Sequence, residues 1–210
     1  VSIHTDGAFL RDPLYNNLQR RKIRVSATER LLLSSEEIKA MSTEEIQAVI
    51  SREFDFDAFK WQQENHVKID EPTRADGLNR VLYKCPHCLT EGKTVGEGTT
   101  LTCTACGKRY TLDEYGYLSA EDGNTKFSHV PAWYEWEREC VREELMAGRY
   151  SLDVPVDIFM TVDTKAFYHV GEGRLTHSVE GFHLTGCEGE LDYEQKPLAS
   201  YTVCSDFNFY

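Results

Sequence analysis

Two closely spaced cysteine pairs limit this chain more than any other feature. Four of its seven cysteines stand in the sequences Cys85-Pro-His-Cys88 and Cys103-Thr-Ala-Cys106. Two thiolates separated by two residues can hold one cation from a single tight turn, and two such turns supply the four ligands that tetrahedral zinc prefers. A short hairpin can join the pairs, because 14 residues lie between them. The spacing predicts a zinc ribbon that binds Zn²⁺ through Cys85, Cys88, Cys103 and Cys106.

Other uses of the two pairs are an iron-binding, rubredoxin-like site and a redox-active dithiol. A thioredoxin-like dithiol needs a βαβ pattern around it, and neither pair has one. His87 could replace one cysteine as a ligand, but with four thiolates available we expect it in an exposed loop. Gly107 follows the second pair and eases a turn with positive φ, whereas Leu89 stands at the equivalent position of the first.

The three remaining cysteines, Cys140, Cys187 and Cys204, are scattered along the chain. Scattered, reduced thiols are typical of a cytoplasmic protein in which cysteine serves packing. We therefore expect no nucleophilic cysteine and no disulfide.

Strand-like segments surround the cysteine pairs and place the ribbon at residues 80–120. We expect strands at 81–84, 99–102 and 109–112. A ribbon of this size has little apolar core, so the metal would supply much of its folding free energy. Removing the metal should then unfold residues 80–120 and leave the regions on either side folded.

The rest of the chain predicts an α+β protein. Residues 1–27 suggest strand, loop and strand, with the strands near 2–4 and 23–25, and residues 28–79 form a helical connector. Helix starts are expected near Ser35 and Ser42, where a hydroxyl residue precedes glutamates. The aromatic residues of this connector, Phe54, Phe56, Phe59 and Trp61, are expected in a core.

Residues 121–210 predict a helix followed by an antiparallel β meander. The helix begins at Pro131, has Trp133 and Trp136 at helical spacing, and stops at Gly148. Apolar and polar residues then alternate in short runs separated by turns. The expected strands lie at 156–162, 166–170, 173–176, 181–185, 190–193 and 200–204.

The charge distribution along the chain restricts the kinds of partner that it can bind. The chain has 23 Lys+Arg and 35 Asp+Glu, a net charge of −12, and the acidic excess lies entirely in residues 111–210. Such a surface repels phosphate backbones and anionic lipids. The exception is the run Arg20, Arg21, Lys22 and Arg24, which is either a solvated basic face or a phosphate contact.

We expect no nucleic-acid partner despite several basic residues near the ribbon, because beyond Tyr83 and Tyr110 no aromatic residues are interleaved with them. No stretch approaches the ~18 apolar residues of a membrane-spanning helix. The start at Val1 and the apolar ending FNFY suggest a piece of a longer protein.

Several segments resemble a known family. The opening SIHTDGAFLRDPLYNNLQRRKIRVSA is similar to the final strands of bacterial lysophospholipid acyltransferases of the 1-acylglycerol-3-phosphate type. The segments DGLNRVLYKCPHC, CTACGKRY and HVPAWYEWERE resemble the zinc-ribbon extension that some Gram-positive members carry after the catalytic domain. The resemblance implies that residues 1–27 end an acyltransferase-like domain and that the rest is its accessory zinc-binding region.

The catalytic motifs of that family do not occur in this chain. Members share a His-x4-Asp motif, whereas His4 is followed by Asp6 and Asp12, neither at that spacing. The stretch Glu97-Gly98-Thr99-Thr100 imitates the family's phosphate-holding Glu-Gly-Thr-Arg motif but lacks its arginine. We therefore assign no catalytic residue and expect the chain alone to be inactive.

Two functions follow from these observations. The first is an accessory region that serves an upstream acyltransferase domain and, through it, reaches the cytoplasmic face of the membrane. The second is a stand-alone zinc-ribbon adaptor that binds protein or nucleic acid.

Overall fold

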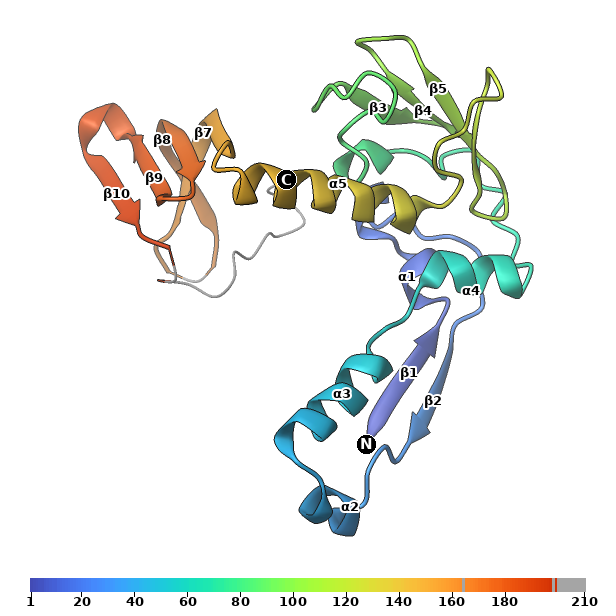
Figure 1. Cartoon of the computed structure of the whole chain (residues 1–210). Coiled ribbons are helices and arrows are strands. Elements are labelled where there is room, and N and C mark those ends of the chain that lie inside the picture. Colours follow the sequence, from blue (N-terminus) through green and yellow to red (C-terminus); the bar gives the residue numbers. More distant parts are fainter. Residues whose placement is uncertain (164, 198, 200–210) are drawn as a thin grey trace. The chain divides into compact units, whose positions relative to one another are not determined.

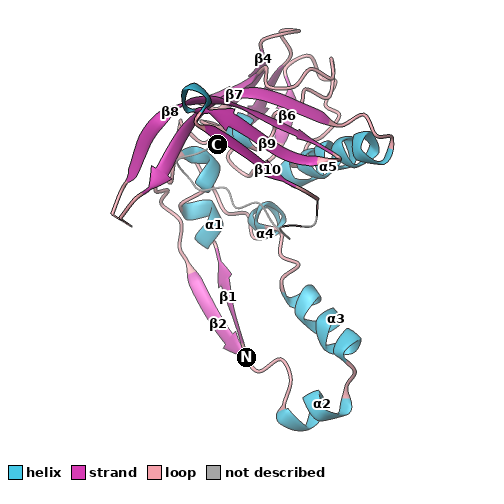
Figure 2. Cartoon of the chain, turned by 90° about the vertical axis from the view of Figure 1, so that its left-hand side faces the viewer, coloured by secondary structure: helices cyan, strands magenta, loops and turns pink. Residues whose placement is uncertain are grey.

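A computed structural model describes residues 1–163, 165–197 and 199. The chain forms two compact units, one comprising residues 1–137 and the other beginning at Arg138 (Figure 1). The described residues contain helices and three antiparallel sheets, which confirms the α+β prediction (Figure 2). The predicted strand at 200–204 lies outside the described residues.

The first unit begins with a two-stranded sheet and a series of short helices. Strands β1 (Ser2–Asp6) and β2 (Ser26–Arg30) pair from Ser2 with Arg30 to Asp6 with Ser26. Between and after them come the helices α1 (Ala8–Arg11), α2 (Ser35–Ala40), α3 (Thr43–Glu53) and α4 (Ala58–Glu64), and 3₁₀ turns at Leu14–Asn16 and Leu78–Arg80.

The strand predicted at 23–25 is wrong. Gly7, with φ of 75°, turns the chain from β1 directly into α1, so residues up to 25 belong to the excursion between the strands. The strand β2 that follows is exposed along its whole length. Its sequence lacks the alternation of apolar and polar residues that predicts a strand, and only pairing with β1 makes this segment a strand.

The two predicted helix starts are confirmed. Ser34 caps α2 and Ser42 caps α3, and in each case the glutamate three residues later completes a capping box. The aromatic residues that follow differ in how deeply they are buried. Phe59 is buried in the core, as predicted, but Phe54 is 80% exposed and Phe56 is 40% exposed.

The ribbon consists of a four-stranded antiparallel sheet in the order β3-β4-β5-β6. Its strands are β3 (Thr94–Glu97), β4 (Thr100–Cys103), β5 (Arg109–Leu112) and β6 (Leu118–Ala120). The predictions at 99–102 and 109–112 correspond to β4 and β5. The strand predicted at 81–84 is wrong, because that segment forms only an isolated bridge between Lys84 and Glu91.

The main hydrophobic core surrounds this ribbon, so the expectation of a nearly coreless ribbon is wrong. Leu101, Tyr110 and Leu118 are at most 2% exposed. They pack with Phe59 of α4 and with Trp133 of α5 (Val130–Met146), the long helix that passes from the first unit into the second. Residues far apart in the sequence form this core, and the local pattern of short strands does not reveal their contacts.

The second unit contains the predicted meander. Strands β7 (Ser151–Thr161), β8 (Phe167–Ser178), β9 (Gly181–Gly186) and β10 (Leu191–Gln195) form a sheet in the order β10-β9-β8-β7. The strands predicted at 166–170 and 173–176 are one strand, β8, whose pairing with β7 shifts by a bulge after Ile158. Ile158 is the one buried hydrophobic residue in the described part of this sheet.

Candidate metal centre

Two turns of the same construction carry the four cysteines. In the first, the N–H of Cys85 donates to the carbonyl of Thr90 at 2.9 Å. In the second, the N–H of Cys103 donates to the carbonyl of Lys108 at 2.8 Å. Each turn therefore fixes its first cysteine by a backbone hydrogen bond and presents its two thiols on one side.

The residue after the second cysteine of each turn adopts a left-handed conformation. Leu89 has φ of 63° and Gly107 has φ of 74°. The N–H of Leu89 donates to the carbonyl of Cys85 at 2.9 Å, and that of Gly107 to the carbonyl of Cys103 at 2.8 Å. Glycine adopts this conformation without strain, whereas a leucine does so at a cost of about 1–2 kcal/mol. The first turn is thus strained where the second is relaxed.

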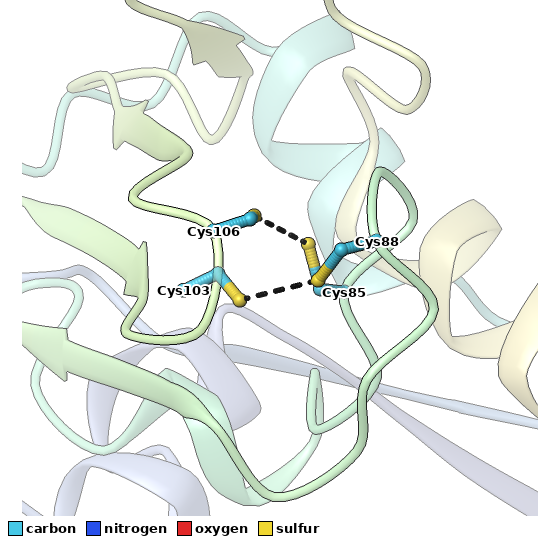
Figure 3. Close-up of side chains that lie close together, drawn as sticks. All are labelled: Cys85, Cys88, Cys103 and Cys106. Atoms are coloured by element: carbon cyan, nitrogen blue, oxygen red, sulfur yellow. Dashed lines mark hydrogen bonds between the residues drawn. The ribbon is translucent and has the colours of Figure 1, made fainter.

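The turns face each other and bring the four sulfurs together (Figure 3). Cys85 Sγ lies 3.8 Å from Cys106 Sγ, and Cys88 Sγ lies 3.7 Å from Cys103 Sγ. All four sulfurs lie within 4.8 Å of one another. In tetrahedral zinc thiolate sites, metal–sulfur bonds of about 2.3 Å place the sulfurs about 3.8 Å apart. A disulfide would need about 2.05 Å. The four cysteines therefore form a group that could hold a metal ion.

The surroundings of the sulfurs differ. Burial raises the pKa of Cys85 to about 12, although the backbone N–H groups of Cys88 and His87 counteract it. Hydrogen bonding to Thr90 lowers the pKa of Cys88 to about 6. Burial also raises the pKa of Cys106. Cys85 and Cys103 are buried, Cys88 is half-buried and Cys106 is exposed. Four thiolates this close together need a cation to offset their charge, and a metal ion supplies it by replacing the thiol protons.

Two side chains of α5 form hydrogen bonds with the backbone of Lys84, the residue that directly precedes Cys85. Glu137 Oε1 accepts a hydrogen bond of 2.7 Å from the N–H of Lys84, and Trp133 Nε1 donates one of 3.0 Å to the carbonyl of Lys84. Both backbone groups of Lys84 are thus used by α5, which explains why the predicted strand at 81–84 did not form. Burial raises the pKa of Glu137 to about 8.

Sequence reasoning missed Glu137 because it singled out only the aromatic residues Trp133 and Trp136 of this helix. The available signal was its position four residues after Trp133, which puts both side chains on one face of the helix. The Glu137 side chain is fully buried, and its second oxygen, Oε2, has no hydrogen-bond partner among the described residues.

The structure also places the other residues named from the sequence. His87 is exposed in the first turn, as expected. Glu97-Gly98-Thr99-Thr100 lies at the junction of β3 and β4. Cys140 and Cys187 are half-buried and distant in sequence from the metal group, whereas Cys204 lies outside the described residues.

The run at residues 20–24 is not a continuous basic face. Arg21 is 5% exposed, and its guanidinium donates to Tyr15 Oη and to the carbonyl of Arg74, both at 2.9 Å. It therefore joins two loops of the first unit and cannot serve as a surface contact to phosphate.

Three of the basic residues near the ribbon have acidic partners. Lys84 pairs with Glu91 at 2.9 Å, Lys108 with Asp122 at 2.6 Å, and Arg109 with Glu121 at 3.3 Å. These pairs neutralise much of the positive charge on which a nucleic-acid interface would depend.

None of the described helices combines the length and the apolar character that crossing a membrane requires. Comparison of the chain with protein-family models, with curated proteins and with solved structures gave no match.

Proposed function

We propose that the chain is a zinc-binding module whose metal centre is structural. The observation that carries this proposal is the spacing of the four sulfurs, with cross-turn distances of 3.7 and 3.8 Å. Zinc fits a set of four thiolates at these distances. Such a set fills the tetrahedral coordination sphere and leaves no position for water or substrate, which favours a structural over a catalytic role.

The position of the centre explains what the metal would stabilise. Cys85 and Cys103 are at most 1% exposed and border the core formed by Leu101, Tyr110 and Trp133. Zinc at this point would join the ribbon hairpin to the segment before Cys85 and, through Lys84, to α5. The metal would thus stabilise the whole core of the first unit.

Elemental analysis tests the proposal. Protein purified without chelator should contain one zinc per chain, and Cys103→Ser should lose it. Cys140→Ser is the matched control and should retain the metal. Iron in place of zinc would support a rubredoxin-like centre instead. A disulfide between any two of the four cysteines in freshly purified protein would contradict a metal centre of either kind.

We also propose that this module accompanies a lysophospholipid acyltransferase domain and reaches the cytoplasmic face of the membrane through it. Sequence resemblance supports this proposal, in residues 1–27 and in the double cysteine motif. The chain alone, incubated with an acyl donor and lysophosphatidate, should give background turnover. Turnover that disappears in His4→Ala would contradict an accessory role.

The adaptor alternative is favoured in its protein-binding form. The ion pairs of Lys84, Lys108 and Arg109 with neighbouring carboxylates argue against a nucleic-acid surface on the ribbon. A labelled single-stranded oligonucleotide should therefore not bind the zinc-loaded chain at physiological salt. Tight, salt-dependent binding would overturn this preference.

A further inference from the structure

A cleft with aromatic walls lies in the first unit, apart from the cysteine group. It has a volume of about 770 Å³. Three half-exposed rings from different elements line it: Phe9 of α1 is 47% exposed, Phe56 before α4 is 40% exposed, and Tyr134 of α5 is 43% exposed. Monomers seldom leave several large rings partly exposed around one hollow without a binding role.

The floor of this aromatic cleft is buried. It includes Phe59, which is 5% exposed and belongs to the main core. Phe9 packs on Phe59 with ring centroids 6.1 Å apart and on Tyr15 at 6.5 Å. Helices α1 and α4, which carry Phe9 and Phe59, run close together in Figure 1. The Phe9 ring therefore packs against two aromatic rings of the same unit.

The charges around the aromatic cleft have one sign. Asp55, Asp57 and Glu135 line it, and its lining contains no lysine, arginine or histidine. Asp57 is engaged, because Oδ2 lies 2.6 Å from His129 Nε2 and Oδ1 accepts from the N–H of Lys60 at 2.9 Å. The exposed carboxylate of Asp55 has no hydrogen-bond or ion-pair partner among the described residues.

We propose that the aromatic cleft binds the cationic side chain of a lysine or arginine from a partner protein. The faces of aromatic rings attract an ammonium or guanidinium group, and the long aliphatic stem of either side chain can fill the apolar floor. Asp55 supplies a carboxylate at the rim. An anionic ligand would be repelled by these carboxylates, and a purely apolar one would leave the exposed carboxylate of Asp55 without a partner.

The test uses the ¹⁵N-labelled, zinc-loaded full chain and small probes. The chain is titrated with N-acetyl-lysine methylamide and N-acetyl-arginine methylamide, while N-acetyl-norleucine methylamide serves as the neutral control. The cationic probes should shift the amide resonances around Phe9, Phe56 and Tyr134 in a saturable way. Added salt should weaken the effect, because exposed charges are screened.

Matched variants locate the site. Tyr134→Ala should lower the affinity for the cationic probes about fivefold, the effect of one lost cation–π contact. Tyr117→Ala, which removes a tyrosine that is 44% exposed and outside the cleft, should not change it. Asp55→Asn should weaken binding at low salt, and its effect should vanish at high salt. Retention of the remaining amide resonances shows that each variant is folded.

Other outcomes would overturn the proposal. Equal shifts with the norleucine probe would make this a site for neutral apolar ligands. Shifts that map elsewhere, or saturable binding that Tyr134→Ala leaves unchanged, would remove the aromatic cleft as the site. Because no metal ligand lines the cleft, failure here would leave the zinc assignment intact.

Discussion

Glu137 accepts a hydrogen bond of 2.7 Å from the N–H of Lys84, which directly precedes Cys85. This contact joins the middle of α5 to the first cysteine turn across 53 residues of sequence. It makes the helix part of the support of the metal centre. The buried carboxyl and the buried thiols therefore contribute to one core.

Metal removal should destabilise the core of the whole first unit. Chelation would leave the buried sulfurs of Cys85 and Cys103 without a cation, next to Leu101, Tyr110 and Trp133. Hydrogen exchange measured by mass spectrometry should show faster exchange in peptides containing Phe59 and Trp133 as well as in the ribbon. The hairpin of β8 and β9 should keep its protection. Faster exchange confined to residues 80–120 would contradict this prediction and would indicate that the ribbon unfolds independently of the rest of the core.

Replacing Glu137 by Gln should change how stability depends on pH. The folded pKa of about 8 lies above the unfolded value of about 4.3, so the folded state holds a proton that the unfolded state releases. The stability contribution of this group is fully present below pH ~4.3 and is lost as the pH rises through about 8. Between these values the loss approaches about 1.4 kcal/mol per pH unit.

Glu137→Gln keeps an acceptor for the Lys84 N–H but does not titrate. Urea unfolding of the zinc-loaded proteins between pH 6 and 8 should therefore show that the variant gains stability relative to the wild type as the pH rises. Comparing the two proteins cancels the pH dependence of metal binding, which they share. Glu143→Gln, at an exposed position of the same helix, is the control and should follow the wild type. If the unfolding free energies of wild type and Glu137→Gln changed in parallel with pH, the assignment of Glu137 as a buried, protonated carboxyl would be wrong.

Replacing Leu89 by Gly should stabilise the chain. The left-handed conformation costs leucine about 1–2 kcal/mol, and glycine avoids this cost. The greater conformational entropy of glycine in the unfolded state offsets part of the resulting gain in stability. The expected net gain is about 0.5–1 kcal/mol, because the Leu89 side chain is 59% exposed and little packing is lost. The urea midpoint of the zinc-loaded protein measures it. Leu89→Ala, which keeps the Cβ and hence the strain, should give no such gain, and a loss of stability in Leu89→Gly would show that the side chain makes a contact worth more than the strain.

The sequence by itself determined the features that depend on neighbouring residues. The two cysteine turns, the helix starts near Ser35 and Ser42, and the strand β5 follow from residues a few positions apart. Their hydrogen bonds or ligands are local, so a short pattern is enough to predict them. Even the strain at Leu89 was visible as a missing glycine.

Only the tertiary structure decided what the distant segments do to one another. Arg21 belongs to a basic run, yet it is buried, and its guanidinium donates to Tyr15 Oη and to the carbonyl of Arg74. Glu137 belongs to the charged sequence of α5, yet it lies under Lys84. In each of these two cases one hydrogen-bond partner lies 53 residues away in the sequence. A local pattern records the polarity of a side chain but not the partner that compensates it, and that is why the core around the ribbon had to come from the fold.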